Sequence, residues 1–330
     1  MIKKVNKFNN NISFYFKILC FVSLLYPLAT KAQPDSVKIG AYLTSLHDFN
    51  LNDKTFSAEI HIWCLYNNKE FNFEKELDIK NNNEVSYTGT STLKIKNQYW
   101  FYTKALVLVR KNWETQNYPF DRQSLNLMIE SFEYDKKDLL FLPDLQNTKL
   151  SGDLLKNLDD WVLFDSKVDV DSTLYDTNFG NSDYSDQSVF SKFNFKIELN
   201  RKASFAILFK LITGLLVAFI IAISVFFIKP INTDPRFGLC VGALFAAVGN
   251  KYIIEGIIPP IAGLSMLDQL HNLTFIFIII IIISSIISLR VYEKGTEKAI
   301  KRSNYFDKIM FALILIAFVV LFSRIIIVNI

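Results

Sequence analysis

Apolar and polar residues alternate along the first half of the chain, and residues 37–200 contain no long apolar run. The alternation is clearest in Val37–Leu43, Phe56–Leu65, Leu93–Lys96, Ala105–Val109, Leu125–Ile129 and Phe193–Leu199. A period of two puts successive side chains on opposite faces of a strand, so that one face is buried and the other is solvated. The pattern predicts an antiparallel, immunoglobulin-like β-sandwich over residues 33–200.

Residues 201–330 carry long apolar runs instead, which predict a four-helix transmembrane bundle. Phe205–Ile228 holds 24 residues with one charge, Lys210, and is long enough to cross a hydrocarbon layer about 30 Å thick. The other predicted spans are Phe237–Ile258, Leu273–Leu289 and Met310–Val328.

The second span differs from the others because Asn250, Lys251 and Glu255 interrupt it. Polar groups inside a membrane are costly unless they face water or protein, so we expect this helix to line a wet space. The alternative is a helix buried among the other three. A helical projection places one line of residues on a single face: Gly238, Gly242, Phe245, Gly249, Tyr252 and Gly256.

This face has two interpretations. Around a shared axis, rings of Phe245 and Tyr252 side chains would form constrictions that close a pore by dewetting. Glycines spaced by four also permit close helix packing, and this alternative would rotate the face away from a pore.

The first 32 residues have the order of a secretory signal peptide: Lys3, Lys4 and Lys7, the apolar run Ile18–Leu28, and small residues near Ala32. An uncleaved anchor helix is the alternative. Export of the β domain puts Arg290–Arg302 inside, in agreement with its five basic residues. The loop Ile258–Leu267 then faces the same compartment as the β domain.

Amino-acid composition argues against several classes of protein function. An apolar content of 51% with 15% aromatic residues argues against a wholly soluble enzyme. Residues 33–200 carry 18 Lys/Arg against 26 Asp/Glu, whereas residues 201–330 carry 13 against 6, beside apolar runs, so nucleic acid is not an expected partner. The three cysteines and three histidines are scattered, so we expect no metal site formed by them. No sequence pattern resembles a nucleophile elbow, a P-loop or metal-ligand spacing, so we expect no cofactor and no catalysis.

The hexapeptide Tyr118–Gln123 (YPFDRQ) resembles the signature loop of the pentameric ligand-gated ion channels, the Cys-loop receptor superfamily. Lys111 and Leu125 stand at the positions where that family has its two cysteines, and this absence of the cysteines resembles the bacterial members. Further landmarks follow in family order over residues 37–330: Trp63, Trp161, Phe193–Lys202, Arg236, Pro259 and Leu264–Gln269. The tryptophan-proline segment of the family's ligand pocket has no match, and Thr213-Gly214 stands where many members have proline.

The resemblance implies a joint between the two domains where Asp121 lies close to Arg201 and transmits a tilt of the sandwich to the first span. An exposed ion pair of little energetic value is the alternative. Phe120, Asp53 and Pro259 are the other expected coupling residues, with Asn52 and Pro260 beside them.

By resemblance, a small-molecule or ionic ligand binds at subunit contacts of the β domain. The candidate residues are aromatic and suit a cationic amine: Trp63, Phe132, Tyr134, Tyr175, Phe179 and Tyr184. Core packing is the alternative for these side chains. Residues 151–190 carry nine Asp and two Lys, which could hold a divalent cation, although a solvated loop is the simpler interpretation.

The resemblance, together with the predicted signal peptide and spans, implies a homopentameric ligand-gated channel in a bacterial inner membrane, with the β domain extracellular or periplasmic. Its partners would be identical subunits, the lipid bilayer, a ligand and permeant ions. Carboxylate rings at Asp234 and Glu255 favour cations, although Arg236 and Lys251 oppose them. The alternative is a membrane-anchored receptor of the same architecture that does not conduct.

Overall fold

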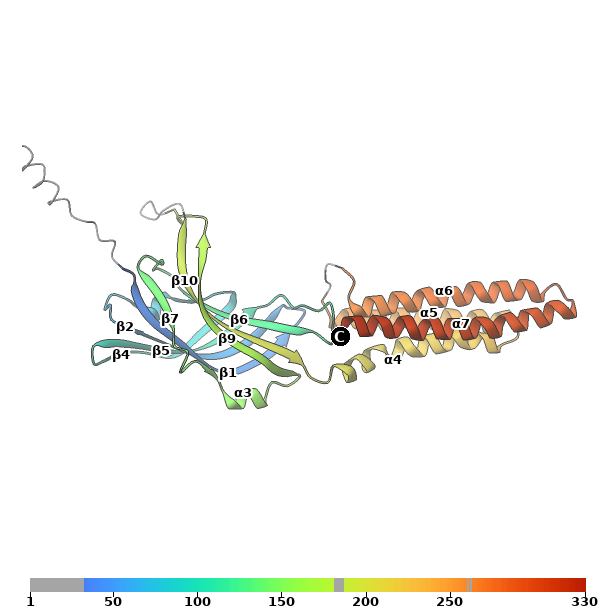
Figure 1. Cartoon of the computed structure of the whole chain (residues 1–330), viewed down its shortest axis with the longest axis horizontal. Helices are drawn as coiled ribbons and strands as arrows, with labels where there is room; N and C mark the ends of the chain where they lie inside the picture. The colour runs from blue at the N-terminus through green and yellow to red at the C-terminus, as the bar shows by residue number, and fades with distance from the viewer. Residues whose placement is uncertain (1–32, 181–186, 260, 262) are drawn as a thin grey trace, which may run out of the picture.

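The computed structural model describes residues 33–180, 187–259, 261 and 263–330. Ten strands form a sandwich-like β domain, and the four long helices that follow extend from one end of it (Figure 1). The predicted signal peptide, residues 1–32, lies outside the described residues. The change from strands to helices falls between Arg201 and Ser204, where the composition changes.

The larger sheet has the order β4-β5-β2-β1-β7, with β8 also paired to β1. Its strands are β1 (Asp35–Asn50), β2 (Thr55–Tyr66), β4 (Asn82–Ile95), β5 (Gln98–Arg110), β7 (Leu139–Pro143) and β8 (Lys149–Leu150). The smaller sheet has the order β3-β6-β10-β9, with β3 (Leu77–Ile79), β6 (Arg122–Ser131), β9 (Trp161–Tyr175) and β10 (Ser188–Arg201). Short helices α2 (Phe73–Glu76) and α3 (Gly152–Lys156) lie between strands.

The six segments with clear alternation lie in strands, except that Lys96 follows the end of β4. The apolar positions of five of them contribute to one core between the sheets, whereas Leu93 and Ile95 of β4 are 52% and 49% exposed and do not. The antiparallel prediction is wrong at one edge, because β7 and β8 pair with β1 in parallel. The chain crosses from β6 in one sheet to β7 in the other, so no hairpin imposes an antiparallel arrangement there.

The four helices are α4 (Ser204–Ile223), α5 (Thr233–Ile257), α6 (Met266–Tyr292) and α7 (Glu297–Asn329), and the 3₁₀ turn η1 (Ser224–Phe227) extends α4. In the described part of the chain, these are the helices long and apolar enough to cross a membrane. Ser265 and Asp268 form a capping box at the start of α6, and Thr296 caps α7.

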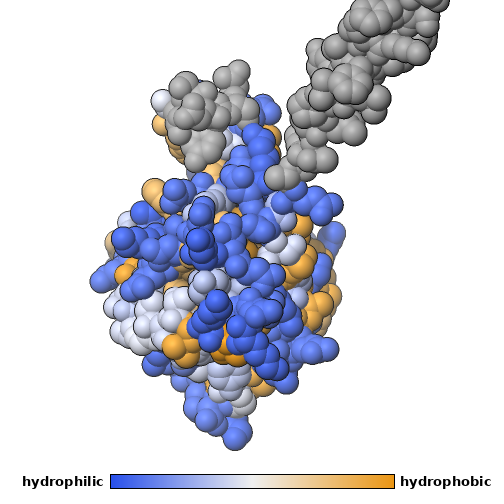
Figure 2. Space-filling model, turned by 90° about the vertical axis from the view of Figure 1, so that its left-hand side faces the viewer, coloured by the Kyte–Doolittle hydropathy of each residue, from blue (hydrophilic) through white to orange (hydrophobic). Residues whose placement is uncertain are grey.

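Aromatic rings join α4, α6 and α7. The ring of Phe318 on α7 stacks on Phe219 of α4 at 3.6 Å and meets Phe277 of α6 edge-on at 5.5 Å. These contacts hold α7 against one side of the α4–α6 pair, while α5 packs against the same two helices through Cys240, Ala243 and Ala247. The far end of the β domain, opposite the helices, is mostly hydrophilic with small apolar patches (Figure 2).

Candidate functional site

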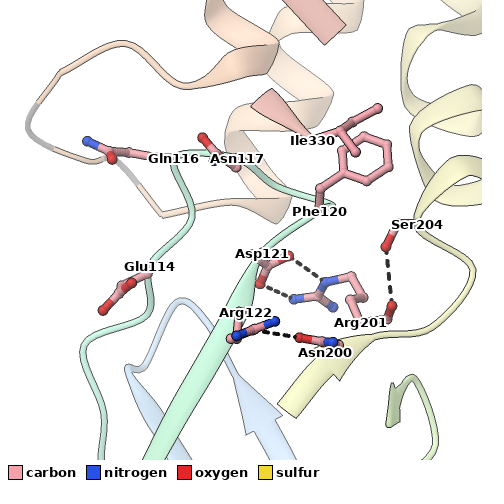
Figure 3. Close-up of a pocket in the computed structure, with 10 residues that line it drawn as sticks. All are labelled: Glu114, Gln116, Asn117, Phe120, Asp121, Arg122, Asn200, Arg201, Ser204 and Ile330. Carbon is pink, nitrogen blue, oxygen red and sulfur yellow. Dashed lines mark hydrogen bonds and ion pairs between the residues drawn. The ribbon is translucent and has the colours of Figure 1, made fainter. Parts of the chain in front are cut away.

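Asp121 and Arg201 meet at the joint between the β domain and α4 (Figure 3). Arg201 donates from Nε to Oδ1 of Asp121 at 2.8 Å and from Nη2 to Oδ2 at 3.0 Å. The side chains are 6% and 1% exposed, so the alternative of an exposed ion pair does not apply. Gln123 donates a further hydrogen bond to Asp121 at 2.8 Å, which completes the solvation of the carboxylate.

Aromatic rings hold the Arg201 guanidinium in place, since it lies 4.1 Å from the ring of Trp161 and 4.6 Å from that of Tyr118. The ion pair forms one wall of a cavity of about 560 Å³, which also reaches Glu114, Ser204 and the terminal residue Ile330. In Figure 3 the side chain of Ile330 lies beside Phe120. Four separate parts of the chain therefore converge on the joint.

Further contacts cross from the β domain to the helices. The turn after β1 reaches the end of α5, where Asn52 donates to the carbonyl of Gly256 at 3.3 Å. The backbone N–H of Met266 donates to the carbonyl of Gln116 at 2.9 Å, and the ring of Phe120 meets that of Phe205 at 5.0 Å. Within this turn, Asn52 makes the contact to α5, whereas Asp53 accepts a hydrogen bond from Asn50 of its own turn.

Pro259 is buried just beyond the end of α5 and lines a cavity with Glu255 and Asp268. It lies among the helices, and its neighbour Pro260 lies outside the described residues.

Three of the predicted ligand residues come together in a second cavity, of about 460 Å³, on the smaller sheet. The ring of Tyr175 lies 5.5 Å from that of Phe179 and 5.5 Å from that of Phe190. Phe132 is 79% exposed and Phe179 is 60% exposed, so both rings are free of core packing. Core packing therefore does not explain these two side chains.

A buried carboxylate forms the polar end of this cavity. Glu130, whose side chain is 2% exposed, accepts hydrogen bonds from Thr173 and from the Tyr175 hydroxyl, the latter at 2.8 Å. The ammonium of Lys80 lies 3.6 Å from Glu130 and 3.0 Å from Asp78. Burial lowers the pKa of Lys80, but hydrogen bonds to Tyr175 and Asp78 outweigh it, so the pKa is raised overall and the ammonium stays charged.

The remaining predicted ligand residues lie elsewhere. The indole of Trp63 covers Gly40 in the larger sheet and donates to Asp144 at 3.2 Å. Tyr134 packs on Phe71 with ring centroids 4.6 Å apart. Tyr184 lies outside the described residues. The structure thus unites Phe132, Tyr175 and Phe179 and leaves Trp63 and Tyr134 apart.

The predicted pore residues of α5 are exposed in the single chain. Phe245 is 71% exposed and Tyr252 is 69% exposed. The other predicted pore residues are also exposed: Asp234, Gly238, Gly242, Gly249, Glu255 and Gly256. A Cβ atom built on any of these four glycines would meet nothing within 4 Å, so no helix in the described part of the chain packs against them.

The opposite face of α5 holds Arg236 and Asn250, whose partners come from the neighbouring helices and loop. Arg236 is 1% exposed and donates to the carbonyl of Ile228 and to Asp307 of α7. Asn250 donates to the carbonyl of Leu211 in α4 at 3.1 Å and lies 3.0 Å from Nε2 of His271 in α6. Asn250 therefore faces protein, because neighbouring helices supply its hydrogen-bond partners, whereas the expectation that α5 lines a wet space concerns the exposed face of the helix.

The sequence pattern did not identify Lys80, Glu130 and Phe190 as residues of the aromatic cavity. Glu130 occupies an outward position of β6, where the period-two alternation predicts a solvated polar side chain. The tertiary structure instead places the Tyr175 hydroxyl against its carboxylate. The described part of the acidic stretch at residues 151–190 supplies no metal-ligand cluster.

A scan against protein-family models finds no match to this chain, and a search of curated proteins finds no match either.

Proposed function

We propose that this chain is the subunit of a homopentameric ligand-gated ion channel of the Cys-loop receptor superfamily, of the bacterial type without the loop disulfide. The sandwich would be immunoglobulin-like, exported by residues 1–32 and placed outside the inner membrane. The observation that carries the proposal is the exposed glycine-and-aromatic face of α5. Of the four helices, α5 has the least apolar sequence, so water suits its exposed face better than lipid does.

Charge on α5 supports a preference for cations. Asp234 is exposed at the start of the helix, whereas the neighbouring Arg236 is buried and paired with Asp307. Five copies would therefore present a ring of carboxylates without the opposing ring of guanidinium groups. At the other end, Lys251 lies 3.7 Å from Glu255 and 3.9 Å from Asp268, which weakens the contribution of Glu255.

The ligand site of the proposal is the cavity around Tyr175. Three carboxylates and one ammonium line it, together with exposed aromatic rings, and this combination attracts a cationic ligand. The coupling route is the joint, where the Asp121–Arg201 pair ties the β domain to α4 and Asn52 touches α5. A movement of the β domain would reach two helices through these contacts.

Single-channel recording of the purified protein in planar bilayers tests the proposal. We expect cation-selective unitary currents, and Phe245→Ala should raise the current without ligand because it removes an apolar ring from the constriction. Phe209→Ala, which truncates a ring 66% exposed on α4, is the matched control and should leave that current unchanged. Silent bilayers over broad ligand and pH screens would favour the non-conducting receptor, in which the open glycine face packs against another copy.

A further inference from the structure

Three cationic side chains line a cavity of about 570 Å³ at the end of the β domain that faces the helices, and one of them, Lys111, donates to the carbonyl of Asn112 at 2.9 Å. Lys54 lies in the turn that also contacts α5, and Arg110 and Lys111 end strand β5 and begin the next loop. In the described part of the chain none of these three side chains forms an ion pair. Other lysines of the same domain do, as Lys38 and Lys104 pair with acids at 3.0 and 2.8 Å.

The remaining lining groups suit an anion. Arg110 donates from Nε to Asn83, and its terminal guanidinium nitrogens have no acceptor among the described residues. The hydroxyl of Ser124 is buried, lines the cavity and has no hydrogen-bond partner there. The one acid of the lining, Asp53, already accepts from Asn50 at 2.7 Å.

Three cations beside a single acid leave an excess of positive charge at this cavity, where like charges repel and the half-buried Lys111 loses solvation. Burial lowers the pKa of Lys111, and the charge of Glu114 offsets this only in part. An oxyanion in the cavity would offset this excess of positive charge and accept from the Ser124 hydroxyl.

We propose that this cavity binds an oxyanion, a carboxylate or phosphate group, held by Lys54, Arg110, Lys111 and Ser124. The site is separate from the aromatic cavity around Tyr175 and does not depend on the proposed channel function. The oxyanion can come from a free solute or from a lipid headgroup, because the cavity lies at the membrane end of the β domain.

Calorimetric titration of inorganic phosphate into the full-length protein at constant ionic strength tests the site. We expect saturable binding that Arg110→Gln/Lys111→Gln weakens about tenfold or more, since two charge-assisted contacts are lost. Lys192→Gln/Lys196→Gln removes the same charge from β10 outside the cavity and should bind as the wild type does. Ser124→Ala should weaken binding severalfold while unfolding at the wild-type temperature, which keeps the test valid if the double variant fails to fold.

Nanodiscs distinguish the two sources. If phosphatidylglycerol raises the unfolding temperature over phosphatidylcholine and the cavity variants abolish this gain, the ligand is a headgroup. If the cavity variants weaken phosphate binding but do not change the unfolding temperature in phosphatidylglycerol, the ligand is a free solute. The proposal would be overturned if phosphate binding is not saturable or is weakened equally by both double variants, and if the cavity variants also leave the effect of phosphatidylglycerol on the unfolding temperature unchanged.

Discussion

The Asp121–Arg201 pair allows a quantitative test of the domain joint through Asp121→Asn. Asparagine keeps the shape of the side chain but removes the charge that balances the buried guanidinium. Arg201 is 6% exposed at its side chain and cannot reach solvent without leaving the rings of Tyr118 and Trp161. The substitution therefore strands a buried cation, whereas loss of an exposed pair would cost little.

Removal of one partner from a buried ion pair lowers the free energy of unfolding by about 3–5 kcal/mol. Asparagine still accepts one hydrogen bond from Arg201, so we expect about 3 kcal/mol for Asp121→Asn. For a domain of this size, 1 kcal/mol shifts the unfolding temperature by about 2–4 °C. The unfolding temperature of the β domain should then fall by about 6–12 °C.

Tryptophan fluorescence during heating is the assay, because all four tryptophans of the chain lie in the β domain and report its unfolding alone. Lys196→Gln breaks a pair with Glu198 whose side chains are 43% and 26% exposed, and it is the control with an expected shift below about 2 °C. Asp121→Asn/Arg201→Gln should recover part of the loss, since no unpaired charge remains. Equal small shifts for Asp121→Asn and Lys196→Gln would refute the view that the joint depends on this pair.

Other expected outcomes concern the β domain and α5. Gly40→Ala should lower the unfolding temperature by several degrees, because the added Cβ would lie 2.4 Å from the rigid indole of Trp63; an unchanged temperature would show that Trp63 can move aside. Burial raises the pKa of Asp144, but hydrogen bonds from Asn147, Lys38 and Trp63 outweigh it and hold the pKa below its usual value. A lowered carboxyl pKa stabilises the fold above the unfolded-state value of about 4, and this stability is lost as the pH falls through the folded-state pKa. Acid titration of unfolding should therefore show a smaller loss below about pH 4 for Asp144→Asn than for the wild type, and equal losses would exclude Asp144 as a contributor. For α5, a cysteine at Gly249 should react with a water-soluble thiol reagent faster than one at Ala247, which is buried; equal rates would contradict a wet glycine face.

The sequence predicted the strands whose apolar positions alternate, because alternation directly reports one buried face. It missed β9, whose residues Asp165, Lys167, Asp169 and Asp171 make an edge strand with little burial and poor strand propensity. It also missed the parallel pairing of β7, since strand direction depends on how the chain crosses between sheets and not on local pattern.

The candidate site residues show the same distinction between contacts that the sequence predicts and contacts that only the tertiary structure creates. Resemblance placed Asp121 near Arg201, and the structure shows the two in contact. The projection of α5 grouped Gly238 to Gly256 on one face, because a helix fixes which residues share a side, and the structure shows that these residues are exposed in the single chain. The partners of Glu130 and Asn250 come from strands and helices distant in sequence, so no local pattern could have identified them.

Images of single particles of the detergent-purified, full-length protein test the central claim most directly. The account predicts five copies around one axis, with α5 innermost and the side chains of Phe245 and Tyr252 directed at that axis. A particle of one copy, or an assembly in which the glycine face of α5 is turned toward the detergent, would contradict it.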